Sequence, residues 1–243
     1  VFLTTEGEKL YTHVAAAMEQ LFTAEEELAE CVGLSHGSIA IGASETALNL
    51  FLLDKLKEFH NTYPGIRLKI YNHSTPQAVQ ALENGLVDFA VVTTPVALKK
   101  PLQRVPLYSF REILIGGEEY AEIASRRHCL QDLQDIPLIG IAPGTSTREL
   151  YTQYFMRHNL PFSPDMEVAT TDQIFPMVQH NLGIGFFPEE LAAEHIARGK
   201  IVQIPIEEPL PERKICLIRN VKRPQSIAAR SLEEHLTSHR ETE

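Results

Sequence analysis

An alternation of strand and helix patterns between residues 38 and 95 constrains the fold of this chain more than any other feature. Residues 38–43 place Ile39 and Ile41 on one face, as a short strand does. Beyond Ser44 the apolar residues recur at steps of three and four: Leu48, Phe51, Leu52, Leu56 and Phe59. This spacing predicts an amphipathic helix that is capped by Ser44 and ends at the Tyr63-Pro64-Gly65 turn.

The same alternation then repeats. Residues 66–70 carry apolar side chains at every second position, which predicts a second strand. Thr75 followed by Pro76 predicts a helix start, and that helix runs to Gly85. Residues 88–92 form a nearly continuous apolar strand. Two successive βα units predict a parallel sheet, and ligands bind such sheets beyond the carboxyl ends of their strands.

The length and charge of the chain limit its partners. With 243 residues, the chain is long enough for one large domain or two smaller ones with their own cores. Its formal net charge is -10, whereas a surface that binds nucleic acid needs a basic face. We therefore expect these residues not to hold nucleic acid themselves.

The cysteines and the termini give further expectations. Cys31, Cys129 and Cys216 are odd in number and far apart, with no metal-site spacing, which predicts reduced thiols and a cytoplasmic protein. No stretch is apolar over about eighteen residues, so no membrane span is expected. The chain begins at Val1 with neither an initiator methionine nor a signal peptide, and we expect it to be a piece of a longer protein.

Residues 4–32 predict one long helix, with a capping box from Thr5 and Glu8 and an end at Gly33. Its apolar residues alternate four- and three-residue steps, the spacing of a coiled-coil seam: Leu10, Val14, Ala17, Leu21, Ala24, Leu28 and Cys31. A seam of this length predicts a partner helix and hence a dimer. The alternative is a surface helix packed on its own domain.

The second half of the chain repeats the strand–loop–helix pattern of the first. Residues 137–148 predict a strand, a hydroxyl-rich loop and a helix start, and Thr171-Asp172 is expected to cap a further helix. Proline-marked connectors at about 94–106 and 205–212 divide the chain into two lobes. The strand and helix after the second connector are expected to return to the first lobe. The predicted fold is therefore α/β, bilobal, with two crossovers and a cleft at the hinge.

Five segments, in this order and spacing, resemble one family over essentially the whole chain. FLTTEGEKLY resembles the end of a winged helix-turn-helix domain running into a linker helix, and GSIAIGASETALNLFLLDKLKEFHNTYPGIRLKI resembles the start of an effector-binding domain. ALENGLVDFAVV, VQHNLGIGFFPEELA and SIAARSLEEHL are similar to three later segments, although Asn181 stands where a glycine is usual. The family is that of the LysR-type transcriptional regulators.

This resemblance implies the architecture. It implies a linker and dimerisation helix over 1–34 and an effector-binding domain over 35–243. Within that domain, lobe one covers 38–95 plus 213–243, and lobe two covers 106–205. The two Rossmann-like lobes form a type II periplasmic-binding-protein-like fold.

The resemblance also implies partners. A small-molecule effector in the cleft changes how a tetramer, dimerised through its linker helices, holds promoter DNA. DNA contact belongs to the N-terminal domain that is missing from this chain. No cofactor, no metal, no membrane and no catalytic residue are implied.

Carried over by position, the implied effector contacts lie in the strand-to-helix loops and at strand ends. They are Ser44, Glu45, Thr46, Ser74, Thr75, Thr93, Thr94, Thr145, Ser146, Thr171 and Phe187.

The residues themselves also favour a carboxylate-bearing or anionic effector. Helix starts at Ser44, Thr75 and Thr147 present free backbone N–H groups, and the hydroxyls add uncharged donors. The plain alternative is that these hydroxyls only cap their helices. Glu45 either faces solvent or receives an ammonium group of the effector, and His73 either contacts the effector or is an exposed loop residue.

Other functions fit the sequence less well. His235 and His239 have helical spacing, but no third metal ligand is suggested. A solute-binding protein of a transporter would share the two lobes, but it would need an export signal and no coiled-coil helix. An enzyme on the same scaffold would need an acid, a base or a cofactor lysine in the loops, and no lysine lies there.

Overall fold

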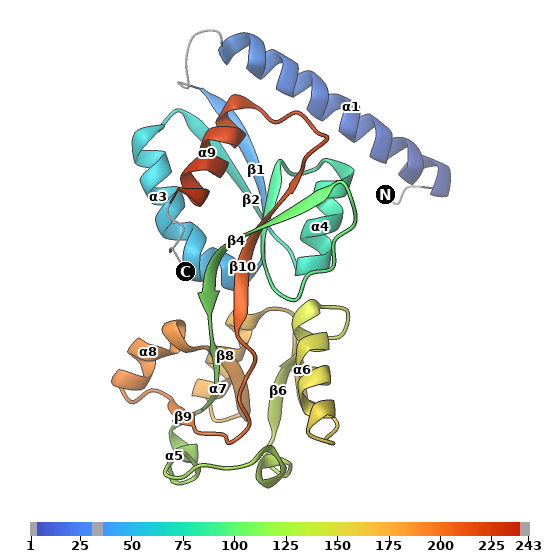
Figure 1. The fold of residues 1–243 in the computed structure, drawn as a ribbon. Helices are drawn as coiled ribbons and strands as arrows, with labels where there is room; N and C mark the ends of the chain where they lie inside the picture. Colours follow the sequence, from blue (N-terminus) through green and yellow to red (C-terminus); the bar gives the residue numbers. More distant parts are fainter. Residues whose placement is uncertain (1–3, 31–35, 239–243) are drawn as a thin grey trace. The chain divides into compact units, whose positions relative to one another are not determined.

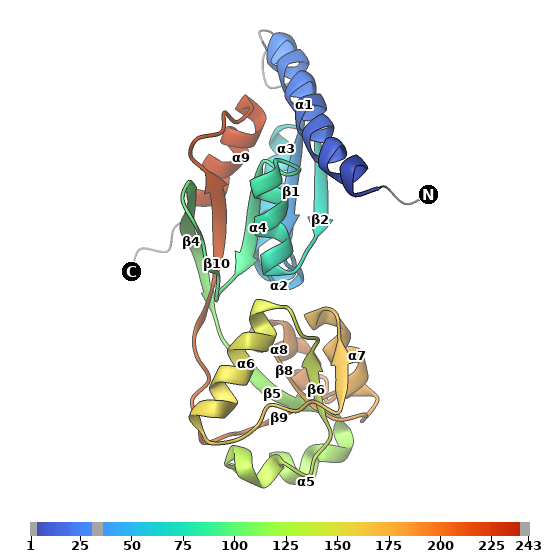
Figure 2. The same ribbon diagram turned by 90° about the vertical axis from the view of Figure 1, so that its right-hand side faces the viewer.

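The computed structural model describes residues 4–30 and 36–238. The chain divides into two compact units, each built around a five-stranded sheet (Figure 1). The first unit comprises residues 1–92, 97–108 and 216–243, and the second comprises 93–96 and 109–215. Each unit places helices against its sheet, so the α/β class with two lobes and two crossovers is confirmed (Figure 2).

The first unit begins with the long helix α1 (Thr5–Glu30). The cap is Thr4 and not Thr5 as predicted, because the Gly7 N–H donates to Thr4 Oγ1 at 3.1 Å. Large apolar residues of α1 are exposed: Leu10, Tyr11, Val14, Met18 and Leu21. The predicted stop at Gly33 and the seam position Cys31 lie outside the described residues.

The first sheet has the strand order β2-β1-β3-β10-β4. Its strands are β1 (Gly37–Ala43), β2 (Ile66–Asn72), β3 (Phe89–Thr93), β4 (Leu102–Phe110) and β10 (Arg213–Asn220). Strand β1 pairs in parallel with β2 and with β3, which confirms the two predicted βα units. Ile39 and Ile41 are fully buried in its centre.

The helix after Ser44 follows the predicted periodicity but contains an irregular turn. It consists of α2 (Glu45–Ala47), a π-helical turn η1 (Leu48–Leu52) and α3 (Leu53–Thr62), without interruption. Leu52, Leu56 and Phe59 lie on its buried face. Single π-helical turns inside α-helices are frequent at functional sites.

Two further caps also lie one residue before the predicted position. Helix α4 (Thr75–Asn84) is preceded by Ser74, whose backbone N–H and hydroxyl both donate to Gln77 Oε1 at 2.9 Å. In the second unit, Thr170 rather than Thr171 precedes the short helix η4 (Thr171–Gln173). Thr75 and Thr171 are therefore the first residues of their helices.

The boundaries between the units lie at 92–93, 96–97, 108–109 and 215–216. The boundary at 96–97 falls in the first proline-marked connector, whereas those at 108–109 and 215–216 fall inside β4 and β10. Strand β4 includes Pro106, and an edge strand tolerates a proline because that residue lacks an N–H to donate. The second unit therefore extends to residue 215, beyond the predicted end of lobe two at 205.

The second sheet has the order β7-β6-β8-β5-β9. Its strands are β5 (Glu112–Gly116), β6 (Leu138–Ile141), β7 (Met166–Val168), β8 (Ile184–Pro188) and β9 (Val202–Ile204). Strand β6 pairs in parallel with β7 and β8, whereas β5 is antiparallel to β8 and β9. The carboxyl ends of β6, β7 and β8 therefore meet at one edge.

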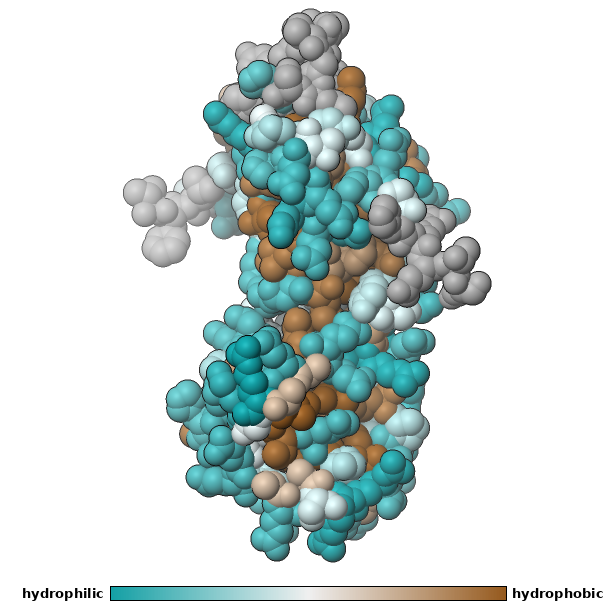
Figure 3. All heavy atoms as spheres, turned by 90° about the vertical axis from the view of Figure 1, so that its left-hand side faces the viewer, coloured by the Kyte–Doolittle hydropathy of each residue, from teal (hydrophilic) through white to brown (hydrophobic). Residues whose placement is uncertain are grey.

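Helices and short turns cover both faces of the second sheet. The helices are α5 (Ala121–Ala124), α6 (Ser146–Arg157), α7 (Ile174–Gln179) and α8 (Glu189–Ala197), with a 3-10 turn η3 (Leu130–Leu133). One core contains Ile139, Ile174 and Phe187, and the other contains Leu114, Phe155 and Phe186. On the face drawn in Figure 3, hydrophobic side chains are surrounded by hydrophilic ones in each unit.

Two left-handed residues end helices as their sequences predict. Asn181 has φ 58° and follows α7, where the sequence has asparagine and not glycine. Gly85, after α4, has φ 76°, and its backbone N–H bonds Leu82. A Cβ at Gly85 would overlap the guanidinium of Arg223, whereas Gly199, with φ 68°, has open space around that position.

Gly85→Ala and Gly199→Ala are expected to cost similar stability. Both changes place an L side chain in the left-handed region, which costs about 1–2 kcal/mol. Gly85→Ala must also displace the guanidinium of Arg223, but this group is the far end of a flexible side chain and can move aside at little cost. Urea unfolding followed by circular dichroism measures both losses, and Gly199→Ala is the matched control. A clearly larger loss in Gly85→Ala would contradict this expectation and show that Arg223 is held in place.

Candidate functional site

In the first unit, the loops after β1 and β2 are bound to each other. The His73 N–H donates to the Ala43 carbonyl at 2.9 Å. Glu45 accepts one hydrogen bond from Asn72 Nδ2 and another from Asn49 Nδ2, each at 2.7 Å. Both carboxylate oxygens of Glu45 thus already have amide donors, and the first and second predicted loops lie side by side.

Ser44 holds a buried hydroxyl without a partner. Its backbone is extended (φ -78°, ψ 148°), as an N-cap requires, but its side chain makes no capping bond. Ser44 is 8% exposed, and among the described residues its Oγ has no hydrogen-bond partner. Thr46, two residues further, is also buried. The capping explanation is wrong for Ser44.

In the second unit, Thr145 caps α6. Its hydroxyl accepts from the Arg148 N–H at 3.1 Å and donates to the Ala142 carbonyl at 3.3 Å. Thr145 is thus occupied by capping. Ser146 begins α6 and is buried, and the backbone N–H groups of this first turn have no intrahelical partner.

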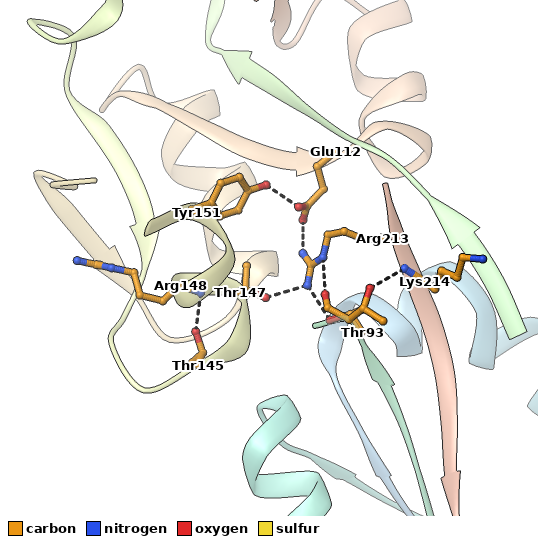
Figure 4. Close-up of polar contacts among 9 residues, drawn as sticks. Thr93, Glu112, Thr145, Thr147, Arg148, Tyr151, Arg213 and Lys214 are labelled. Carbon is orange, nitrogen blue, oxygen red and sulfur yellow. Dashed lines mark hydrogen bonds and ion pairs between the residues drawn. The ribbon is translucent and has the colours of Figure 1, made fainter. Parts of the chain in front are cut away.

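A buried arginine connects the first turn of α6 with the end of β3 (Figure 4). Arg213 is 1% exposed, and its Nη2 donates to Thr93 Oγ1 at 2.8 Å and to Thr147 Oγ1 at 3.0 Å. Its Nε donates to the Thr94 carbonyl at 2.9 Å. The guanidinium therefore fixes two hydroxyls and one backbone carbonyl from separate segments of the second unit.

The charge of Arg213 is balanced inside the protein. Its Nη1 lies 2.8 Å from Glu112 Oε1, and both side chains of this ion pair are almost completely buried. Tyr151 donates its hydroxyl to Glu112 Oε2 at 2.5 Å. Burial first, and the Glu112 charge second, raise the pKa of Tyr151 well above its usual value. The phenol therefore stays protonated and continues to donate to the carboxylate.

The remaining predicted residues have different surroundings. Thr94 bonds the backbone of Lys214 through both its own N–H and its hydroxyl. Thr171 lines a small pocket together with Thr147 and Tyr151. Phe187 packs in the apolar core, 6.0 Å from the Phe175 ring. Thr171 is thus placed beside the buried network, whereas Phe187 is not.

Several other chemistries find no support in the part of the chain that the structure describes. No cluster of three or more potential metal ligands occurs there, and His239 lies outside it. Cys129 and Cys216 are thiols and not disulfide-bonded. No helix in the described ranges is long and apolar enough to span a membrane.

Comparison with known proteins decides the family. The family model of the LysR substrate binding domain matches residues 33–241. The chain belongs to the LysR family. It carries the effector-binding part of a transcription regulator, and the family is not one of enzymes.

Curated relatives of the LysR chain are transcription regulators. A probable RuBisCO transcriptional regulator from Trichormus variabilis is 24% identical over 208 residues, which cover 84% of this chain and 62% of that protein. The HTH-type transcriptional activator CmpR from Synechocystis is 24% identical over 254 residues, with 99% of this chain and 79% of that protein covered. The chain thus spans less than two thirds of the first of these relatives.

Solved structures of similar fold include ligand-bound domains. The effector binding domain of QuiR in complex with shikimate has a TM-score of 0.73 at 20% identity, covering 84% of this chain and 97% of that one. The regulatory domain of CcmR from Synechocystis PCC6803 in complex with 2-PG has a TM-score of 0.75 at 19% identity, covering 85% and 99%. At these identities the likeness shows a shared fold, the type II periplasmic-binding-like one.

Sequence reasoning missed three members of the buried network, and it named the fourth, Thr147, only as a helix start. Arg213 and Glu112 stand at the starts of strands, where a charged residue normally faces solvent. Thr147 and Tyr151 lie on α6 without a distinguishing motif. The one available signal is that Glu112 directly precedes Ile113, Leu114 and Ile115 in a strand that is buried on both faces.

Arg213→Met is expected to destabilise the protein by about 3–5 kcal/mol, because it leaves the Glu112 carboxylate buried without its cation. Adding Glu112→Leu removes that charge as well and should recover a large part of the loss. Urea unfolding by circular dichroism measures both, since the chain has no tryptophan.

The matched control is Arg198→Met, which removes the same side chain from an exposed pair with Glu194. Its cost should stay below about 1 kcal/mol. A loss at Arg213 as small as that at Arg198 would contradict the role given to the buried pair.

Proposed function

We propose that this chain is the effector-sensing and oligomerisation part of a LysR-type regulator, and that it binds a small metabolite carrying a carboxylate or similar anionic group. The observation that carries the proposal is the buried, unpartnered hydroxyl of Ser44 at the start of a helix. An unpaired buried hydroxyl is costly, so a ligand that pairs it gains free energy.

The surroundings of Ser44 favour an anion. The helical run that begins at Glu45 directs its unpaired backbone N–H groups toward the same end, and its dipole adds about 0.3–1 kcal/mol toward negative charge. The side-chain amides of Asn49 and Asn72 each donate a hydrogen bond to the Glu45 carboxylate. Because both carboxylate oxygens already have a donor, Glu45 does not require an ammonium group of the ligand. We therefore place Ser44 and Thr46 in the primary effector contact.

The start of α6 offers a second set of donors, within the second unit. Its first turn carries unpaired backbone N–H groups at Ser146 and Thr147. Because Thr147 Oγ1 already accepts from Arg213, its own hydrogen is left to donate to another acceptor. Arg213 itself is neutralised by Glu112, so these donors select a small anion by hydrogen bonding and not by net positive charge.

The similar structures provide the first compounds to test. Shikimate, bound by QuiR, carries a carboxylate, and 2-PG is the ligand of CcmR. A thermal-shift screen should begin with these two and continue through amino acids, carboxylates and sulfur metabolites. A compound that raises the melting temperature in proportion to its concentration is then taken to calorimetry.

Ser44→Ala is expected to weaken binding of that compound by about threefold to tenfold, the value of one hydrogen bond. The unfolding free energy should stay the same or rise, because the variant removes an unsatisfied buried group. Thr145→Ala is the matched control: it deletes a hydroxyl that caps a helix and should cost about 1 kcal/mol of stability. Unchanged affinity in Ser44→Ala would remove Ser44 from the site.

We also propose that α1 dimerises the chain and that the full protein is a tetramer. Leu10 and Leu21, two seam residues, are 64% and 61% exposed. Leaving such a stripe in water is unfavourable, and a second copy of the same helix fits its spacing.

Leu21→Glu is expected to shift the chain from dimer toward monomer, because it puts a carboxylate into the seam. Thr12→Glu adds the same charge on the opposite side of α1 and should leave the dimer intact. Analytical ultracentrifugation at micromolar concentration distinguishes the two. A monomeric wild-type chain would contradict the coiled-coil proposal.

DNA contact is proposed for a helix-turn-helix domain of the longer protein, as in relatives named HTH-type regulators. The net charge of -10 on the present chain agrees with this division. The proposed location is the cytoplasm, where promoter DNA is. A mobility-shift assay should show promoter binding by the full-length protein and none by residues 1–243.

A further inference from the structure

The second unit contains an apolar cavity that takes no part in the proposed effector site. Its volume is about 120 Å³. It is lined by Leu114 of β5, Phe186 of β8, Leu133 of η3 and Phe155 of α6, among others. None of the implied effector residues lines this cavity.

The cavity lies beside a densely packed cluster of aromatic rings. Around it, the Tyr151 and Phe186 rings stack with their centroids 4.4 Å apart, and those of Phe155 and Phe162 are 5.0 Å apart. Protein interiors normally hold few voids larger than a water molecule. Water gains little in this cavity, because most of its lining is aliphatic or aromatic.

Residues 128–133 carry two lining residues, Leu130 and Leu133, and are held by hydrogen bonds to groups that do not line the cavity. The Leu130 N–H donates to both carboxylate oxygens of Glu208, each at 3.1 Å. The His128 N–H donates to the Pro205 carbonyl at 3.0 Å, and the Cys129 N–H donates to Asp132. Since these bonds do not depend on what fills the cavity, the space is preformed, as small-molecule pockets usually are.

The residues at the mouth of the cavity favour a neutral ligand over an anionic one. Gln134, Ser163 and Asp165 are exposed at the rim. Asp165 Oδ2 accepts from the Leu138 N–H at 2.8 Å, but its negative charge remains at the opening. Among the described residues that line the cavity, none is cationic. An anionic ligand would therefore lose its hydration and be repelled by Asp165.

We propose that this cavity is a second ligand site, for a small neutral ring compound with one hydrogen-bonding group. Its volume approaches the roughly 150 Å³ of an apolar cavity that accommodates benzene. The ring packs among Leu114, Phe155 and Phe186, and its polar group reaches Gln134 or Ser163 at the rim. The chemical class is thus the opposite of the anion expected at Ser44.

Phenol and benzoate are a matched pair of probes, because they present the same ring without and with a full charge. Calorimetry and ligand-observed NMR on residues 1–243 are expected to show saturable binding of phenol, and binding of benzoate at this cavity weaker by about tenfold or more. The absence of saturable phenol binding up to about 10 mM would overturn the proposal.

Two variants locate the bound phenol. Ser163→Trp closes the mouth from an exposed position and should lower phenol affinity by about tenfold, while Ser163→Ala should leave it within about twofold. Ser44→Ala should not affect phenol at all. Phenol affinity unchanged in Ser163→Trp, or reduced in Ser44→Ala, would place phenol elsewhere and overturn the proposal. Circular dichroism melts confirm that each variant is folded.

Discussion

The second unit depends on one buried ion pair, between Arg213 and Glu112. Removing a guanidinium and a carboxylate from water is costly, and the cost is offset only where every hydrogen-bonding position finds a partner. Here the Tyr151 hydroxyl donates to the Glu112 oxygen that Arg213 does not bind. Two threonine hydroxyls and a backbone carbonyl accept the remaining hydrogen bonds from Arg213. The planar guanidinium holds its donors in a fixed geometry, so its partners have one arrangement.

That arrangement positions the groups from which a ligand site can be built. Arg213 comes from the start of β10, Thr93 from the end of β3, and Thr147 from the first turn of α6. Segments far apart in the sequence are thereby held within hydrogen-bonding distance of one nitrogen atom. A side chain that binds no ligand itself can still determine where the ligand's donors lie.

The regular elements of this fold could be predicted from the sequence, because they rest on local periodicity. The βαβ pairing of β1 with β2 and β3 follows from alternation and helix spacing. Cap positions were predicted less well: Thr4-Thr5, Ser74-Thr75 and Thr170-Thr171 are pairs of adjacent hydroxyl residues with almost equal capping propensity. In each pair the first residue precedes the helix, a choice that capping propensity alone does not make.

The buried network was not predictable for a different reason. Burial of Arg213 is a property of the assembled sheet and not of its neighbours in the sequence, where Lys214 stands beside it. Arg213 at the start of β10 and Glu112 at the start of β5 form a buried ion pair only in the folded unit, where β5, β10 and α6 lie together. A pairing between residues about a hundred positions apart leaves no local signature.

Ser44 can be compared with two other serines that have a similar backbone conformation. Ser44, Ser74 and Ser226 all precede helices in the extended conformation, with ψ of 148°, 157° and 157°. Ser74 bonds Gln77, and Ser226 accepts from the Ala229 N–H at 3.1 Å.

Of these three serines, which all lie in the described part of the chain, Ser44 alone leaves its buried hydroxyl unpaired. The same residue in a similar backbone conformation thus makes no bond here, whereas Ser74 and Ser226 each make one. Departures from a local rule without local compensation are expected where function has been selected. The unpaired hydroxyl therefore supports the proposal that the helix of Ser44 begins with a place for a hydrogen-bonding ligand, and not with a finished cap.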